Sequence, residues 1–411
     1  MASRRQVTAW GSNSIDEVVM SQRRLLSITA VLPLVLTLAS KAQVFSSYQI
    51  HAHPTVQVSP GPRNPSTPIG ILPVQYKAAY GFNRIPNQGR GQTIAFVDAY
   101  NDPNIASDLA SYASYFHLVP CNLTVAQLGT TQGQGWDLEE SLGVEQACAL
   151  APEANIILVE AASDSLTDLL HAVAVASSAP YNATVVSMSW GFPESEEEQQ
   201  YDSYFCSIVN GNGQPVTFTA AVGGGGHEQI YPSTSPCVVA VGGTALTLST
   251  PLPLPDPLQL NYGNEISGCD GGGISLFEPQ PPWQNPACSQ YSTTYRCVPD
   301  ISADAAADPG IPVYDTYSYG GWVEVGGTSV PTADWAAFFT IVNSLRASQD
   351  KGTLSQSDPD MYTIYYSSNY LTDFHNITDG GCGAGPGYNL ATGIGSYQVN
   401  NLAPTLAADT N

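Results

Sequence analysis

Between residue 91 and residue 243, short runs of apolar residues alternate with segments in which apolar residues recur at helical spacing. The apolar runs lie within residues 91–100, 154–161, 183–191, 214–226 and 237–243. Residues 103–116, 136–151 and 165–178 between them have the spacing of amphipathic helices. Such an alternation predicts a parallel sheet with helices on both faces, in which ligands bind at the carboxyl ends of the strands.

The pattern becomes less regular after residue 243, but no change of composition divides residues 69–408. We interpret the polar, proline-rich residues 43–68 as a linker or extended arm and residues 69–408 as a single domain. Within this domain, residues 268–284 are rich in glycine and look like a wall beside a site. A buried helix begins near Ser329.

The first 42 residues read as a secretory signal peptide, with Met20 as an alternative start. Two arginines precede an apolar run, and Ser40 and Ala42 stand at the −3 and −1 positions of a cleavage site. The apolar run is short for a membrane span, so we expect secretion with no membrane attachment after cleavage. The alternative is an uncleaved anchor.

Charge and cysteine content narrow the class of protein. The first 42 residues hold five of the 12 basic and two of the 35 acidic residues. Residues 43–411 therefore hold 7 basic and 33 acidic residues and have a net charge of −26. Such a surface repels nucleic acid, and it suits either an acidic environment or simple solubility. The eight cysteines suit disulfides in an exported protein, although the sequence leaves their pairing open.

The stretch VGGTSVPTADWAAF places Ser329 at the start of an apolar helix. Helix N–H groups there favour developing negative charge, although a serine that only caps the helix is the simpler interpretation. A nucleophilic serine needs a base, and only His227 among the six histidines follows a strand near the expected site. Glu139, within residues 136–151, is the stronger candidate because a glutamate of raised pKa can act as a general base.

The segments around these residues resemble the sedolisins, which are serine-carboxyl peptidases with a subtilisin-like fold. The resemblance runs in order from about residue 69 to 408. Its carriers are GWDLEESLGVEQACALAPEANIILVEA, VVSMSWG, YPSTSPCVVAVGGTAL, GGGISLFEPQPPWQ, PDISADAAADPGIPVYD and GGTS. The resemblance implies a single α/β domain with a doubly wound parallel sheet, secretion, and hydrolysis of polypeptides at acidic pH.

Two of the four catalytic side chains that the resemblance implies are replaced. Ser329 matches the nucleophile that forms the acyl-enzyme, and Glu139 matches the general base. The acid one helical turn after the base is replaced by Gly143, and the acid that stabilises the oxyanion is replaced by Gly224. Losing an oxyanion-hole group typically lowers kcat by roughly 10²–10³. We expect Asp98 to substitute in part, by reaching Glu139 through the room left at Gly143.

The resemblance also implies a substrate groove and a calcium-binding loop. The groove residues are Trp190, Gly191, Gly271, Gly272 and Gly273. The calcium ligands would come from Asn376, Ile377, Gly385, Gly387 and Asn389. Two of these, Asn376 and Asn389, replace carboxylates by amides, and calcium affinity follows ligand charge. We therefore expect weak or absent calcium binding and no other cofactor.

Three functions follow from these observations. The first is a secreted serine endopeptidase of impaired activity, and the second is an inactive pseudopeptidase that binds polypeptide without cutting it. The third is a secreted structural glycoprotein that reuses the fold. The retained Ser329 and Glu139 favour the first two functions, whereas the replaced acids favour the last two.

Overall fold

The computed structural model describes residues 50–61, 63–133, 135–224, 229–249, 262–355 and 357–409. The expected signal peptide at 1–42 and His227 therefore lie outside the described residues. Among these residues, no helix combines the length and the apolar character that a bilayer crossing requires.

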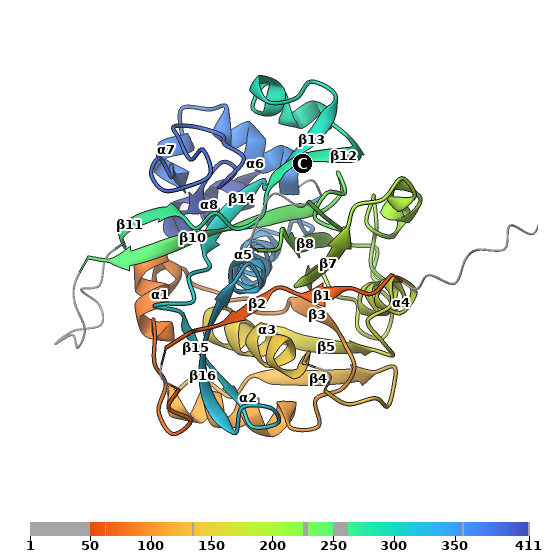
Figure 1. Ribbon diagram of the computed structural model, residues 1–411, viewed down its shortest axis with the longest axis vertical. Helices are drawn as coiled ribbons and strands as arrows, with labels where there is room; N and C mark the ends of the chain where they lie inside the picture. The colour runs from red at the N-terminus through yellow and green to blue at the C-terminus, as the bar shows by residue number, and fades with distance from the viewer. Residues whose placement is uncertain are drawn as a thin grey trace, which may run out of the picture. The chain divides into compact units, whose positions relative to one another are not determined.

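A central sheet runs through the described part of the domain in the strand order β11-β10-β8-β6-β3-β5-β4, with β14 also paired to β10 (Figure 1). All of its pairings are parallel except that of β10 with β11. Its strands are β3 (Thr93–Ala99), β4 (Asn122–Gln127), β5 (Asn155–Ala161), β6 (Val185–Met188), β8 (Thr217–Ala221), β10 (Val239–Leu248), β11 (Tyr262–Ser267) and β14 (Ile301–Asp304). The predicted parallel sheet is confirmed.

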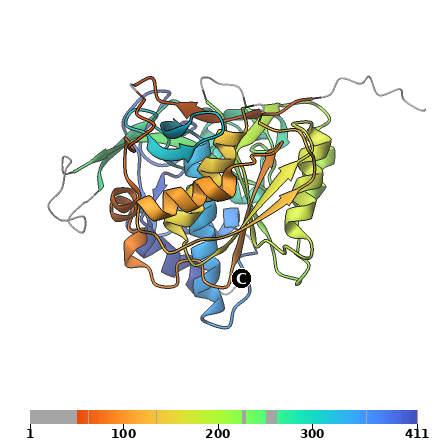
Figure 2. The ribbon, with the colours of Figure 1, turned by 90° about the horizontal axis from the view of Figure 1, so that it is seen from below.

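Helices cover both faces of this sheet. Ile94 and Phe96 of β3 pack into the cluster formed with α2 (Ile105–Tyr115), α3 (Asp137–Leu150) and α5 (Ser329–Ala347). Ala95 and Val97, the alternate residues of β3, pack into the cluster formed with α4 (Leu166–Ser177). Figure 2 shows α4 on one side of the sheet and α3 and α5 on the other. The predicted two-sided arrangement is therefore confirmed.

The remaining elements surround this layered core. The helices are α1 (Pro73–Tyr80), α6 (Ser357–Tyr365), α7 (Tyr370–Asp373) and α8 (Val399–Ala408). The strands are β7 (Trp190–Pro193), β9 (Ile230–Tyr231), β12 (Gly273–Pro279), β13 (Tyr295–Val298), β15 (Ile311–Asp315), β16 (Gly321–Gly327), β17 (Phe374–His375) and β18 (Ser396–Tyr397). All eight cysteines form disulfides: Cys121–Cys148, Cys206–Cys237, Cys269–Cys382 and Cys288–Cys297.

Residues 50–58, which we call the strap, form an extended arm, one of the two alternatives that their composition predicted. Within the strap, β1 (His53–Pro54) pairs antiparallel with β7, and β2 (Val56–Val58) pairs antiparallel with β16. Figure 1 shows the two strands as one extended segment that crosses the domain. Of the two alternatives for 43–68, residues 50–58 therefore follow the extended arm and not the linker, because the strap's backbone N–H and C=O groups pair with strand edges far away in the sequence.

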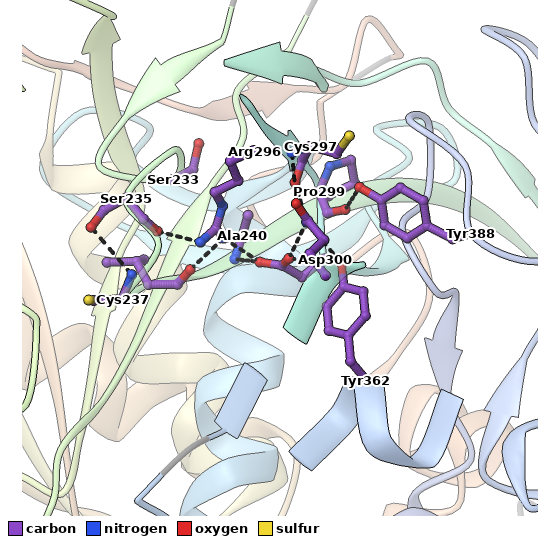
Figure 3. A network of polar contacts seen from close by, with 12 residues as sticks. Ser233, Ser235, Cys237, Ala240, Arg296, Cys297, Pro299, Asp300, Tyr362 and Tyr388 are labelled. Carbon is purple, nitrogen blue, oxygen red and sulfur yellow. Dashed lines mark hydrogen bonds and ion pairs between the residues drawn. The ribbon is translucent and has the colours of Figure 1, made fainter. Parts of the chain in front are cut away.

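A buried ion pair between Arg296 of β13 and Asp300 links β13 to the residues around the start of β10 (Figure 3). Arg296 and Asp300 are fully buried, and Nη2 of the arginine lies 2.5 Å from Oδ2 of the aspartate. The guanidinium also donates to the carbonyls of Ser235 at 2.6 Å and Val238 at 2.8 Å. Asp300 accepts a hydrogen bond from the N–H of Ala240, in β10, at 2.9 Å. Both charges therefore have partners on the sheet side.

Replacing Arg296 by methionine should lower the free energy of unfolding by about 3–5 kcal/mol, because Asp300 would remain as an uncompensated buried charge. Urea denaturation followed by circular dichroism measures this. The control is Arg90→Met, which breaks a surface ion pair with Glu153 in which the arginine side chain is 69% exposed. The control should leave the midpoint almost unchanged. Equal midpoints for the two variants would contradict the prediction.

Candidate active site

Ser329 is the first residue of α5 and lies beneath the strap. It follows a tight turn in which Gly327 has φ +90°, a left-handed conformation that favours glycine. Thr328 is the N-cap of α5, and its side chain accepts a hydrogen bond from the N–H of Gly223 at 3.1 Å. The turn after β8 and the start of α5 are thereby held together. Ser329 is fully buried, and its Oγ lies 2.8 Å from Oγ1 of Thr55 in the strap.

Glu139 reaches the same place from the first turn of α3. Its side chain is buried, and Oε2 accepts a hydrogen bond from the N–H of Val56 at 3.1 Å. Burial raises the pKa of Glu139 to about 7, while hydrogen bonds from the Ser329 hydroxyl and from Val56 act to lower it. The structure thus brings Ser329 and Glu139 together, with Thr55 and Val56 of the strap against them.

The strap and Glu139 offer two acceptors for the proton of Ser329. The Thr55 hydroxyl can donate to the carbonyl of Ser189 at 3.2 Å, which leaves its oxygen free to accept from Ser329. A hydroxyl has one proton to donate, so Ser329 donates either to Thr55 or to Glu139, and the second bond is the one that acts to lower the pKa of Glu139. The strap therefore competes with the general base for the proton that the base would have to remove.

Asp98 lies near Glu139, but its side chain does not use the space beside Gly143 to approach the glutamate. A Cβ at Gly143 would lie 2.6 Å from Cδ1 of Phe96, so the phenyl ring already fills that space. Phe96 and Asp98 lie two residues apart on one face of β3. The expected access through Gly143 is wrong for this reason. Burial and the charge of Glu139 nevertheless raise the pKa of Asp98 well above its ordinary value, which shows that the two carboxyls interact.

The strap also fills the space at Gly224, where the resemblance implies an acid. A Cβ at this position would lie 2.5 Å from Nε2 of Gln57 and 4.0 Å from Oδ1 of Asp270. Asp270 was not among the residues expected in the site, although its place in GCDGGG was a usable signal. Burial raises its pKa to about 6. Asp270 is therefore a carboxyl close to the replaced position.

The expected groove residues divide into two groups. Trp190 and Gly191 lie on β7 and pair with the strap, as Pro54↔Trp190 and His53↔Gly191. A hollow of about 410 Å³ extends along the strap beside β7 and the 222–224 turn. Gly271, Gly272 and Gly273 instead have positive φ angles, and a Cβ at Gly271 would lie 2.4 Å from the carbonyl of Val222. Gly271 therefore packs against the turn, and none of the three glycines lines this hollow.

The expected calcium loop does not fit a calcium ion. Nδ2 of Asn389 donates to the carbonyls of Gly385 at 3.1 Å and Gly387 at 3.3 Å. Oδ1 of Asn376 accepts from the N–H of Gly387 at 3.0 Å and from the hydroxyl of Tyr370 at 3.1 Å. Calcium binds oxygen ligands. Here the carbonyls that were expected to bind calcium accept hydrogen bonds from the amide of Asn389 instead. Ile377, also expected there, is buried.

We predict that the melting temperature of the protein is the same with a chelator as with millimolar calcium. Asn389→Asp removes the donor to the two carbonyls and should lower the melting temperature. Adding Asn376→Asp restores two carboxylates, so the double variant should be stabilised by calcium. Scanning fluorimetry measures all three proteins. A rise in the wild-type melting temperature on adding calcium would show that the loop binds the ion as it stands.

Sequence comparisons relate the chain to known peptidases. Residues 129–374 match the subtilase family. Kumamolisin from Bacillus sp. (strain MN-32) is 29% identical over 364 residues, covering 80% of this chain and 62% of the relative. Sedolisin from Pseudomonas sp. (strain 101) is 25% identical over 396 residues, covering 86% and 64%. The chain thus spans less than two thirds of the length of these relatives.

A structural comparison supports the same fold. Pseudomonas sedolisin, a serine-carboxyl proteinase complexed with two molecules of pseudo-iodotyrostatin, superposes with a TM-score of 0.68 at 24% identity. The match covers 84% of this chain and all of that one. The expected subtilisin-like α/β fold is therefore confirmed.

Proposed function

The chain belongs to the subtilase family, with sedolisins among its relatives, and from this premise we propose that it hydrolyses polypeptides through Ser329 and Glu139. One observation carries the proposal. The strap is an extended polypeptide that lies over Ser329 and Glu139, in what we call the crevice. Antiparallel pairing to β7 on one side of Thr55 and to β16 on the other is a common mode of peptide recognition. A substrate would bind in the same way once the strap leaves.

The contacts of the strap suggest the roles of the catalytic groups. With a substrate residue in the place of Thr55, Oγ of Ser329 attacks its carbonyl carbon while Glu139 takes the hydroxyl proton. The N–H of Val56 on Glu139 marks the place of the leaving nitrogen, which takes that proton as the C–N bond breaks. Water then hydrolyses the acyl-enzyme, with the same carboxylate as the base.

Two further carboxyls would support this chemistry. Asp98 interacts with Glu139 and would share its proton, which makes it a positioning residue. Asp270, close to Gly224, has a pKa raised to about 6, so at acidic pH it is protonated and can donate a hydrogen bond to a developing oxyanion. With the strap in place, the amide of Gln57 lies against the same position, Gly224.

The strap also bears on the working pH. A general base must be ionised, so the rate rises with pH through the pKa of Glu139. That pKa is about 7 in the closed state, mainly because of burial. When the strap leaves, the hydrogen bond from Val56 is lost but water reaches the carboxylate, and because burial is the largest cause of the shift the pKa falls and activity moves toward acidic pH. We include secretion in the proposal, and the four disulfides suit it.

A second candidate function is that of a pseudopeptidase whose crevice its own strap occupies permanently. The amide of Gln57 at the Gly224 position favours this alternative, because a side chain of the strap has taken the space of an acid.

We predict that releasing the strap activates the protein. Val56→Pro removes the N–H that Glu139 accepts and disrupts the pairing of β2. It should raise the rate of hydrolysis of denatured casein at least tenfold and move the acid limb of the pH profile below pH 7. The matched control Val56→Ala keeps the N–H and should behave as the wild type. Ser329→Ala in the Val56→Pro background should be inactive.

The outcome separates the two candidate functions. Val56→Pro protein that is folded and opens the crevice but cleaves no faster than its Ser329→Ala counterpart excludes the peptidase and supports the pseudopeptidase. Opening is measured by protease sensitivity of the strap.

A second prediction concerns Asp98. In the Val56→Pro background, Asp98→Asn should lower kcat by at least about 100-fold with little change in KM, since the amide cannot share a proton with Glu139. Any residual activity should show an altered acid limb in its pH profile, which a purely structural role would not produce. Unchanged kcat and an unchanged pH profile would remove Asp98 from the mechanism.

A further inference from the structure

A second hollow, of about 630 Å³, lies apart from the crevice. It is open to solvent and is lined by the segment 205–209, the start of β8, the start of β10, Trp283 and the first turn of α6. Its lining shares no residue with the hollow along the strap. Most of the lining is apolar, including Phe205, Ile208, Val209, Val216, Phe218 and Trp283. This volume and lining are typical of sites for small organic molecules.

One carboxyl oxygen in this lining lacks a hydrogen-bond partner. Asp358 lies in the first turn of α6 and is 5% exposed. Its Oδ1 is buried and makes no hydrogen bond. A buried carboxyl oxygen without a hydrogen bond is costly, so such a group indicates either a bound proton or a ligand.

Acidic groups outnumber basic groups around Asp358. The guanidinium of Arg296 is the cation that acts on it, and that guanidinium already contacts Asp300 at 2.5 Å. Asp360, on the same helix, adds a third carboxyl. Burial, with Asp300 and Asp360, raises the pKa of Asp358 well above its ordinary value, against the opposing effect of Arg296. A further positive charge would therefore be favourable here.

We propose that this hollow binds a small primary amine, with its ammonium group on Asp358 and an apolar body against the aromatic and aliphatic lining. The ammonium supplies both the missing donor to Oδ1 and the missing positive charge. The apolar body removes the surface of Phe205, Phe218 and Trp283 from water. The site is independent of the proposed peptidase activity.

The proposal has a specific pH signature. An ammonium ion pairs with the ionised form of Asp358, so binding displaces the proton that burial favours on this carboxyl. Affinity for an amine should therefore rise with pH above the ordinary aspartate range, as long as the amine itself stays charged. A neutral molecule of the same shape should show no such rise.

The test uses 2-phenylethylamine and 2-phenylethanol as probes in isothermal titration calorimetry. At pH 7 the amine should bind at least tenfold more tightly than the alcohol. Asp358→Asn should remove that difference and leave the affinity for the alcohol unchanged. Titration in buffers of different ionisation enthalpy should show release of a proton with the amine alone.

A second pair of variants keeps the test decisive if Asp358→Asn fails to fold. Val209 lines the hollow and is 57% exposed, so Val209→Trp should fold and weaken the binding of both probes. Leu371, 66% exposed and outside the lining, provides the control Leu371→Trp, which should bind as the wild type. Ser329→Ala should also bind as the wild type.

Two results would overturn the proposal. The first is equal affinity of the two probes, or no binding of the amine at millimolar concentration. The second is binding of the amine that survives both Asp358→Asn and Val209→Trp. Neither result would affect the proposed hydrolysis, which depends on Ser329 and Glu139 and not on this hollow.

Discussion

The pairing of the strap with two strand edges is the interaction on which the geometry of the crevice depends. Its backbone completes β7 on one side and β16 on the other. Thr55, the residue between these pairings, contacts the candidate nucleophile Ser329. The N–H of the next residue, Val56, donates to the candidate base Glu139. The strap is therefore associated with three features of the crevice: the burial of Ser329, the raised pKa of Glu139 and the filled space at Gly224. A backbone-directed contact of this kind depends little on side-chain identity, so other extended sequences can take its place.

The positions where the resemblance implies acids are each filled by neighbouring groups of this chain. Phe96 fills the space at Gly143, Gln57 fills that at Gly224, and the amide of Asn389 bonds the carbonyls of its own loop. Close packing and satisfied hydrogen bonds make each substitution tolerable for folding, because a vacated space or an unpaired carbonyl would be costly. The fold is thus well accommodated to the loss of these acids, whatever the loss does to catalysis.

The sequence predicted what depends on local pattern. Five strands of the sheet (β3, β5, β6, β8 and β10), α3 with Glu139 and α5 with Ser329 follow from periodicity within short segments, whereas β4, β11 and β14 were not predicted. The docking of the strap could not be predicted in this way, because Thr55 meets Ser329 across 274 residues and the composition of 43–68 carries no sign of the partner. The same holds for Phe96 at Gly143, since an empty position in a sequence does not show which distant side chain fills it. Asp270 was missed because the glycines around it suggested a backbone segment lining the site, and not a side chain that takes part in it.

The buried acids connect the fold to the environment that the charge suggested. Burial raises the pKa of Asp102 and Asp315 to about 7 and that of Asp304 to about 8. Each folded-state pKa lies above the unfolded value near 4, so the folded state binds more protons than the unfolded chain at intermediate pH. Stability is then greatest below pH 4 to 5 as far as these groups decide it, and it declines as pH rises through 7 to 8. The same acidity relaxes the repulsion among surface carboxylates and protonates Asp270. Fold, surface and proposed chemistry therefore favour the same acidic range.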